Sequence, residues 1–150
     1  MDTFEFDVNG EGKTVQGAGD DPLIFALRNQ LHLASPRLGC GQEQCGACRV
    51  LVDGNIDYAC SLQLSTVQGG HITTLEGLEH NPLMRRLQAA FAARNAAQCG
   101  YCLTGVLLAA WHLLSIREVA SDAQVHAPLS RATIASTLDG QLCRCGSHAR

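Results

Sequence analysis

The chain has 150 residues, of which 46% are hydrophobic and 17% charged, and its formal net charge is −3 at pH 7. This length suits one domain of ordinary size or two small ones, and the slight negative charge disfavours a nucleic-acid-binding protein. Aromatic residues make up only 5% of the chain, which also disfavours a surface that stacks on single-stranded bases.

The N-terminal residues predict a β-hairpin. The segment Thr3–Val8 alternates apolar and polar side chains, which is typical of a strand with one buried face. The dipeptide Asn9-Gly10 that follows favours a two-residue hairpin turn. We therefore expect Lys13–Gln16 to be the returning strand.

A helix is expected next, over Pro22–Leu33. Leucines recur there every four residues and would form one apolar face. Asp20 or Asp21 can act as the N-cap, because a carboxylate accepts hydrogen bonds from the free N–H groups of the first turn. A proline suits that first turn, since its missing N–H would have no partner inside the helix.

Three cysteines follow in the glycine-rich segment Leu38–Val50, LGCGQEQCGACRV. Cys40, Cys45 and Cys48 have C-x4-C-x2-C spacing, and Cys60 lies a little further on. This is the plant-type pattern of a [2Fe–2S] cluster, in which two irons each need two thiolates, so four cysteines must converge. The interleaved glycines let the backbone curl and bring N–H groups close to anionic sulfurs. The alternatives are a zinc knuckle and buried free thiols.

Further short strands are expected after the cysteine loop: Val50–Val52, Ile56–Leu62 and His71–Leu75. The dipeptide Asp53-Gly54 favours a turn between the first two of them, and Cys60 would lie in the second strand. The hairpin, the crossing helix and these strands predict a compact α+β unit that ends near residue 77.

Residues 78–150 change to helical patterns. Three segments predict helices: Pro82–Arg94, Thr104–Ile116 and Arg131–Leu138. Asn81 and Ser130 can cap the first and the third. The second is apolar nearly all round, so it should be buried within a bundle. Residues 121–128 read as a connector, and residues 147–150 as the first turn of a helix that the chain does not continue.

Four more cysteines lie at the ends of these helices. Cys99 and Cys102 have C-x2-C spacing, and Cys143 and Cys145 have C-x-C spacing. Helix N-termini offer free N–H groups that stabilise thiolates, so each pair can supply two metal ligands. Spacing alone allows either an iron–sulfur cluster or a tetrahedral zinc site.

The N-terminus and the cysteine content bear on the cell compartment. The first residues are acidic where a secretory signal would have a basic start and an apolar run. Cytoplasm is therefore the default location, with the periplasm as the alternative if a signal-bearing partner exports the folded chain. Without a signal, eight cysteines indicate metal binding or redox use rather than disulfides. The longest apolar run, within residues 106–114, is broken by His112 and is too short to span a membrane.

Five stretches carry a family resemblance: GCGQEQCGACRV, YACSL, ITTLEGL, AAQCGYC and LCRCG. In this order they resemble the small iron–sulfur subunits of the molybdenum hydroxylases of the xanthine oxidase family, over residues 3–148. The resemblance implies an α+β fold, with a ferredoxin-like β-grasp domain over residues 1–77 and an all-α four-helix-bundle domain over residues 78–150. Each domain would bind one [2Fe–2S] cluster.

The resemblance also implies roles for individual residues. Each cysteine set would bind one cluster: Cys40, Cys45, Cys48 and Cys60 in the first domain, and Cys99, Cys102, Cys143 and Cys145 in the second. Gln98 would contact the pterin of a molybdenum cofactor that a separate large subunit holds. The surroundings of Cys145 would also touch this pterin. Electrons would pass from molybdenum to the second cluster, then to the first, and then to an acceptor subunit with cytochrome c or FAD.

Two details indicate the reaction class of the complex. CGYC followed by x-x-G, and CRCG followed by x-H, are similar to the small subunits of nicotinate dehydrogenases. An N-heteroaromatic substrate such as nicotinate is therefore expected, with an aldehyde dehydrogenase complex as the alternative in the same family. Outside the family, the alternatives are a zinc-stabilised protein-interaction module and a free-standing ferredoxin. This chain is expected to carry no catalytic residue and to catalyse nothing alone.

Overall fold

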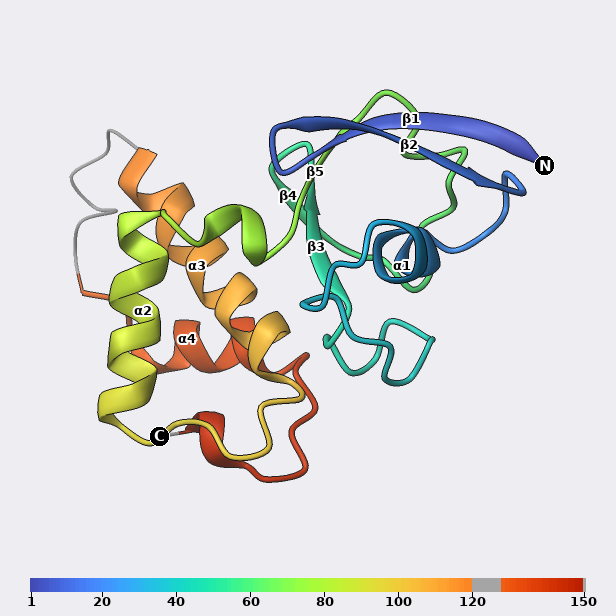
Figure 1. Ribbon diagram of the computed structural model, residues 1–150. Helices are drawn as coiled ribbons and strands as arrows, with labels where there is room; N and C mark the ends of the chain where they lie inside the picture. Colours follow the sequence, from blue (N-terminus) through green and yellow to red (C-terminus); the bar gives the residue numbers. More distant parts are fainter. Residues whose placement is uncertain (120–127, 150) are drawn as a thin grey trace.

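The computed structural model describes residues 1–119 and 128–149. A sheet half, blue to green in Figure 1, lies beside a helical half, yellow to red. The predicted connector over residues 121–128 lies outside the described residues, except for Pro128. Among the described residues, no helix is both long and apolar enough to cross a lipid bilayer.

Five strands form one mixed sheet: β1 (Asp2–Val8), β2 (Glu11–Gly17), β3 (Arg49–Val52), β4 (Asn55–Tyr58) and β5 (His71–Thr73). Their order is β2-β1-β5-β3-β4, with β1 and β5 parallel and the other neighbours antiparallel. Asn9 and Gly10 both have positive φ, 58° and 85°, as a two-residue turn that follows the strand twist requires. The predicted N-terminal hairpin is confirmed.

The helix predicted over Pro22–Leu33 is shorter than expected. It consists of one turn, α1 (Leu23–Phe25), followed by the π-helical segment η1 (Ala26–Gln30). The chain leaves the helix where His32 adopts a left-handed φ of 56°. Leu31, the last leucine of the pattern, still packs against the core beyond the helix, as does Leu33, so the leucine spacing indicated burial and not helix length.

The predicted aspartate cap at Asp20 or Asp21 is wrong. Pro22 occupies the N-cap position without a side-chain hydrogen bond, and the Asp21 carboxylate instead accepts from a backbone N–H of the preceding turn at 2.8 Å. The first two N–H groups of α1 donate to the carbonyl oxygens of Leu62 and Ala59, at 2.7 and 2.8 Å. The segment around residue 60 therefore closes the start of the helix.

The strand predicted over Ile56–Leu62 ends early. β4 stops at Tyr58 because the N–H groups of Ser61 and Leu62 turn back to the Tyr58 carbonyl oxygen, at 3.1 and 3.2 Å. Cys60 therefore lies in a turn beside the start of α1, and not in a strand as predicted. The other predicted strands agree with the structure to within about two residues at each end.

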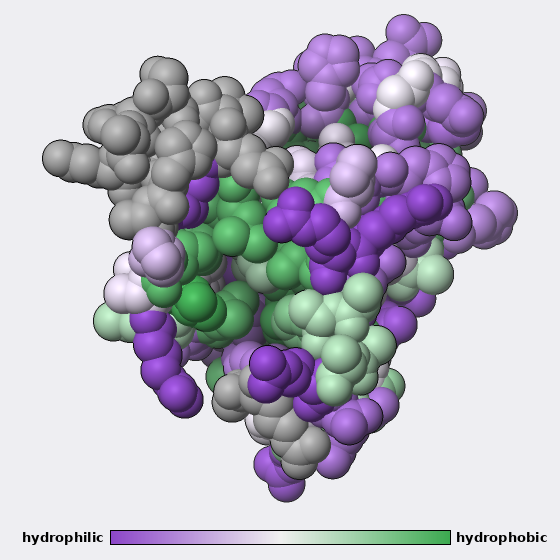
Figure 2. All heavy atoms as spheres, turned by 90° about the vertical axis from the view of Figure 1, so that its left-hand side faces the viewer, coloured by the Kyte–Doolittle hydropathy of each residue, from purple (hydrophilic) through white to green (hydrophobic). Residues whose placement is uncertain are grey.

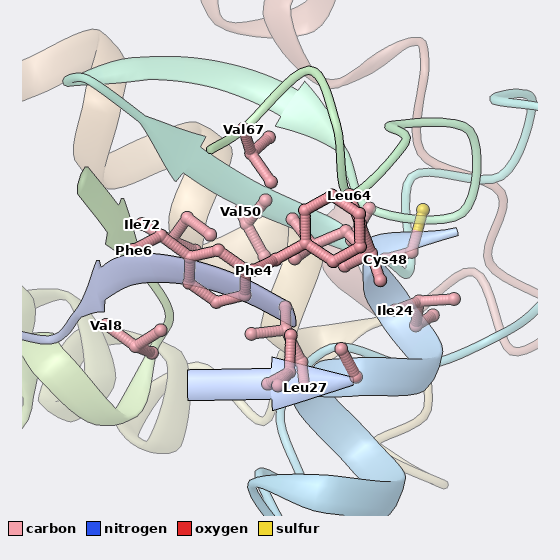
Figure 3. Packing of buried hydrophobic residues seen from close by; sticks show 14 of the residues in the cluster. Phe4, Phe6, Val8, Ile24, Leu27, Cys48, Val50, Leu64, Val67 and Ile72 are labelled. Carbon is pink, nitrogen blue, oxygen red and sulfur yellow. The ribbon is translucent and has the colours of Figure 1, made fainter. Parts of the chain in front are cut away.

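The first hydrophobic core lies between the sheet and α1 (Figure 3). Phe4, Phe6 and Val8 alternate along β1 with polar residues that stay outside this core, which is the predicted pattern. Ile24 and Leu27 meet them from the helical segment, and both are fully buried. This packing holds the helix against the strands, and Cys48 and Cys60 lie in the same core.

The helical half follows η2 (Glu76–Leu78). Its described residues form three α-helices and a closing 3₁₀ turn: α2 (Pro82–Ala93), α3 (Leu103–Val119), α4 (Arg131–Leu138) and η4 (Ser147–Ala149). The three predicted helices are confirmed to within about three residues at each end. Asn81 and Ser130 both accept hydrogen bonds from N–H groups of the first turn, as predicted.

A second core joins the two halves through β3. Val50 lies in the first core, and its neighbour Leu51 lies in the second, because successive side chains of a strand point to opposite faces. Leu51 packs there with Met84 of α2 and Leu108 of α3. The helices therefore rest directly on the sheet. The domain boundary between residues 77 and 78 stays a prediction.

Candidate metal centres

The first cysteine loop, residues 37–48, runs irregularly between η1 and β3. The backbone N–H groups of Gln42 and Gln44 point at the sulfur of Cys40, at 3.3 and 3.2 Å. The Cys40 N–H points in turn at Cys45 Sγ, at 3.4 Å. Hydrogen bonds, the one from Gln42 above all, lower the pKa of the Cys40 thiol to about 7. The loop therefore stabilises a negative sulfur near neutral pH.

Glycines give this loop its shape. Gly41 and Gly46 have positive φ, 68° and 74°, a conformation that other residues adopt at a cost. Gly39 has no room for a side chain, because a Cβ there would lie 2.6 Å from Cys45 Sγ. The loop thus keeps the space around its sulfurs clear, as the close wrapping of a cluster requires.

Cys48 and Cys60 approach the same region from the start of β3 and from the turn after β4. Both are buried, with 1% and 8% of their surfaces exposed. The Cys48 carbonyl oxygen accepts a hydrogen bond from the N–H of Ala59 at 3.2 Å, which joins the two segments. Burial raises the pKa of the Cys48 thiol to about 12, so a bound cation is needed to ionise it.

The second cysteine set lies in the helical half. Cys102 immediately precedes α3, and Cys143 lies between α4 and η4. A hydrogen bond with His148 is the main reason that the pKa of the Cys143 thiol falls to about 6, and the N–H of Gly146 also donates to this sulfur at 3.2 Å. Burial raises the pKa of Cys102 to about 11. This set, like the first, combines a readily ionised sulfur with a less accessible one.

The sulfurs of each set lie close enough to act on one another. None forms a disulfide, and within residues 1–119 and 128–149 no three Cys, His, Asp or Glu side chains meet as ligands of a single ion. The thiols that contribute to each cysteine's pKa shift belong to its own set: Cys45 acts on Cys40, Cys45 and Cys60 act on Cys48, Cys143 and Cys145 act on Cys99, and Cys99 and Cys143 act on Cys102. Each set thus gathers four thiols, which is the number that the two irons of a [2Fe–2S] cluster require, so the donors fit that group.

Gln98 lies next to the second set. It lines a hollow together with Cys99, Cys102, Cys143 and Cys145. The side chains of Gln98 and Cys99 are both exposed. The structure therefore brings Gln98 to the place that the resemblance implies, and its contact with a pterin held by another subunit stays a prediction.

A direct contact between the two cysteine sets was missed by the sequence analysis. The N–H of Leu142, next to Cys143, donates to the carbonyl oxygen of Cys45 at 3.0 Å. Gly105 of α3 lies so close to the first loop that a Cβ there would collide with the carbonyl oxygen of Gly46. The helical half therefore touches the first cysteine loop without an intervening side chain.

Gln141 fills the space beside this contact. Its side chain is 4% exposed, and with its oxygen turned toward Arg49 the carboxamide accepts from the guanidinium group at 2.6 and 3.2 Å. One sequence signal for the junction existed: Gly105 interrupts an otherwise apolar helix, which often marks a close packing contact. Gln141 and Arg49 carried no such signal, because their partners are distant in sequence.

Two iron–sulfur domain families match the chain. Residues 24–92 match a 2Fe-2S iron-sulfur cluster binding domain, and residues 74–150 match a [2Fe-2S] binding domain. A nicotinate dehydrogenase subunit of Pseudomonas putida is 40% identical over 146 residues, which cover 97% of this chain and 87% of that relative. The alpha subunit of isoquinoline 1-oxidoreductase of Brevundimonas diminuta is 37% identical over 148 residues, which cover 98% of this chain and 91% of that relative.

A solved structure agrees. The crystal structure of quinoline 2-oxidoreductase from Pseudomonas putida 86 superposes with a TM-score of 0.78 and 29% identity, over 95% of this chain and 83% of the matched chain. This chain belongs to the small [2Fe–2S] subunits of the molybdenum hydroxylases. The same comparisons confirm three predictions for this iron–sulfur subunit: the xanthine oxidase-family membership, the ferredoxin-like and helical fold, and the [2Fe–2S] cofactors. It is one part of an oxidoreductase complex whose molybdenum cofactor belongs to a partner subunit.

Proposed function

We propose that this iron–sulfur subunit transfers electrons from the molybdenum cofactor of a large subunit to a separate acceptor subunit. The observation that carries the proposal is the gathering of eight cysteines into two sets of four, in a chain of this family. A bound [2Fe–2S] cluster supplies reversible one-electron chemistry. The task of this chain is to hold the thiolates and to shape their surroundings.

The proposal assigns one cluster to each cysteine set: Cys40, Cys45, Cys48 and Cys60 for the first, and Cys99, Cys102, Cys143 and Cys145 for the second. The N–H groups of Gln42, Gln44 and Gly146 point at sulfurs of these sets. Such hydrogen bonds favour the reduced, more negative state of a cluster and so raise its reduction potential.

The second set faces the molybdenum cofactor in this proposal, and the first set faces the acceptor. Cys99 and Gln98 are exposed side by side, whereas Cys48 and Cys60 are buried. An exposed ligand beside an exposed carboxamide suits contact with a group that another subunit holds. Gln98 would hydrogen-bond the pterin through that carboxamide.

The helical half supplies the surface for the large subunit. No residue of α4 is buried, and Ile134 and Leu142 are 41% and 61% exposed. Figure 2 shows hydrophobic side chains gathered in a hollow on this side of the molecule. Phe91 and Leu103 line a groove beside α2 and α3. Exposed apolar surface of this extent favours a protein partner.

The substrate of the complex is proposed to be an N-heteroaromatic compound such as nicotinate. The relatives named for nicotinate, isoquinoline and quinoline support this class. Relatives named as aldehyde oxidoreductase subunits support an aldehyde as the second candidate. The acceptor, with cytochrome c or FAD, and the location in cytoplasm or periplasm stay predictions.

Serine variants of the complex test the electron path. Replacing Cys48 removes a ligand of the first cluster, so Cys48→Ser should abolish one EPR signal while substrate still reduces molybdenum. Replacing Cys102 removes a ligand of the second cluster, so Cys102→Ser should leave molybdenum reducible but stop electrons from reaching the first cluster. Rapid-freeze EPR after mixing with substrate measures both steps.

Each of these two variants controls for the other, because both exchange one sulfur for oxygen in the same chain. Loss of both signals to the same extent in each variant would contradict two separate sites. Zinc in place of iron, and no acid-labile sulfide in the purified complex, would overturn the function itself and favour a zinc-stabilised interaction module.

A further inference from the structure

Arg37 and Tyr101 form a further connection between the two cysteine sets. The Tyr101 hydroxyl donates to the carbonyl oxygen of Leu38 at 2.5 Å. In the opposite direction, Arg37 Nη1 donates to the carbonyl oxygen of Gly100 at 2.5 Å. The guanidinium carbon also lies over the tyrosine ring, 5.5 Å from its centroid, where a cation is attracted to the ring face.

Both ends of this contact are anchored close to cluster ligands. The backbone N–H of Arg37 donates to the carbonyl oxygen of Ala47 at 3.0 Å, so Arg37 is tied to the residue before Cys48. Gly100 lies between Cys99 and Cys102, and its carbonyl oxygen also accepts from the N–H at the start of α3, at 3.3 Å. A movement of either ligand loop would therefore strain this contact.

The junction at Gly105 and the second core already join the two halves, but neither contains a residue of the segments 37–38 or 99–101. The Arg37–Tyr101 contact ties these two segments, which adjoin Cys40 and contain Cys99, directly to each other. We propose that it is a positioning element, which sets the separation of the two clusters and hence the magnetic and electronic interaction between them. This inference rests on the proposed function, because it requires a cluster in each cysteine set.

The chain contains a matched arginine–tyrosine pair whose hydroxyl hydrogen bond lies within the sheet half, although its Arg49 also binds Gln141 of the helical half. Arg49 lies over Tyr58 at 5.3 Å from the ring centroid and donates to its hydroxyl at 3.1 Å, within the β3–β4 pair. Tyr58→Phe therefore removes the same hydroxyl group from the same kind of pair inside one half. A difference between Tyr101→Phe and Tyr58→Phe would report the linkage and not the loss of a surface hydroxyl.

The experiment uses the assembled complex with its clusters reduced. In Tyr101→Phe, the EPR splitting that arises between the two reduced clusters should weaken and broaden, while iron and sulfide contents stay at the wild-type level. Amide exchange in residues 37–40 and 99–102 should rise about two- to tenfold, as expected for one lost hydrogen bond. Arg37→Lys, which keeps the charge but loses the planar fork, should change the splitting in the same direction. Tyr58→Phe should leave it unchanged.

The outcomes separate the two proposals. Unchanged splitting in both Tyr101→Phe and Arg37→Lys, at full iron content, would overturn the positioning role and leave the proposed function intact. An equal change of the EPR splitting in Tyr58→Phe would also overturn the positioning role, since loss of either tyrosine hydroxyl would then have the same effect. If Tyr101→Phe loses iron, the EPR splitting in Arg37→Lys tests the positioning role instead: a weaker splitting supports the role, and an unchanged splitting overturns it. A wild-type complex with fewer than two clusters would instead overturn the proposed function.

Discussion

Hydrogen bonds and burial act in opposite directions on the cysteines of each set. Hydrogen bonds lower the pKa of Cys40 to about 7 and that of Cys143 to about 6. Burial raises the pKa of Cys48 to about 12 and that of Cys102 to about 11. Because the ligating form is the thiolate, loading of each set should release protons, and Cys48 and Cys102, whose pKa values are raised, are among the thiols that lose one.

A carboxylate outside the cysteine sets links the segment before the first loop to the end of the sheet. Glu76 accepts hydrogen bonds from the N–H groups of Ala34 and Ser35, at 3.0 and 2.7 Å, and from the hydroxyl groups of Ser35 and Thr74. Burial acts to raise the pKa of Glu76, but these hydrogen bonds outweigh it, and the pKa lies below its ordinary 4.5.

This shift predicts a loss of stability in acid. Because the folded pKa is lowered, the stabilisation is present above pH 4.5 and is lost as the pH falls through the folded value. We predict that Glu76→Gln lowers the free energy of unfolding at neutral pH by about 1 kcal/mol and removes this part of the acid-side loss. Urea unfolding at neutral and acidic pH measures both effects.

The exposed neighbour Glu79 provides the control, since Glu79→Gln makes the same chemical change nearby. It should leave the free energy of unfolding at neutral pH nearly unchanged. If the free energy of unfolding of Glu76→Gln falls in acid by as much as that of the wild type, another group is responsible for the loss.

At the scale of elements, one side chain joins two helices. Asn81 Oδ1 accepts from the N–H groups of Leu83 and Met84, at 3.0 and 3.1 Å, and so caps α2. The same oxygen accepts from Trp111 Nε1 of α3, at 3.0 Å. We predict that Asn81→Ala lowers the free energy of unfolding by about 2–3 kcal/mol, because it removes a cap and leaves an indole N–H without its partner.

Trp111 is the only tryptophan, so its fluorescence reports on this link directly. In Asn81→Ala the emission maximum should shift, and chemical unfolding gives the change in stability. Ser130→Ala removes the cap of α4, whose hydroxyl oxygen accepts from the N–H of Thr133 at 3.0 Å, and serves as the control. Ser130→Ala should lower the free energy of unfolding by about 1 kcal/mol and leave the tryptophan emission maximum unchanged. Equal effects in both variants would argue against the link.

Local patterns predicted the existence of the elements better than their ends. The caps Asn81 and Ser130 were predicted correctly because in both helices the first-turn N–H groups bond to a neighbouring side chain. The cap predicted at Asp20 or Asp21 was wrong because distant carbonyl groups take the first N–H groups of α1. The helix over Pro22–Leu33 and the strand over Ile56–Leu62 were drawn too long. The helix ends where His32 adopts a left-handed φ. The strand ends where the chain turns back on Tyr58, and Ala59 and Leu62 then accept hydrogen bonds from the first turn of α1.

At the scale of the whole molecule, the approach of α3 to the first cysteine loop depends on Gly105. We predict that Gly105→Ala lowers the free energy of unfolding by about 2–3 kcal/mol, because a Cβ there collides with backbone, although alanine is the better helix former. It should also change the EPR signals of both clusters, since the contact joins both cysteine sets. Thermal unfolding and EPR of the complex measure these effects.

Gly12→Ala is the control for this variant. A Cβ at Gly12 meets no atom within 4 Å, and this glycine does not have positive φ. Its stability and its EPR signals should match those of the wild type. If Gly105→Ala has the same free energy of unfolding as Gly12→Ala, then α3 and the first cysteine loop can move apart at this contact without a loss of stability.

The sequence by itself determined the family, the [2Fe–2S] cofactors and the α+β fold class, because these depend on motifs that lie within a few residues of one another. It also predicted the two cysteine sets. The strand order, the gathering of Cys102 and Cys143 around one hollow and the contacts from Gly105 to Gly46 and from Arg37 to Gly100 were decided only by the tertiary structure. Each of these joins residues far apart along the chain, and such contacts form only when the sheet and the helices pack together.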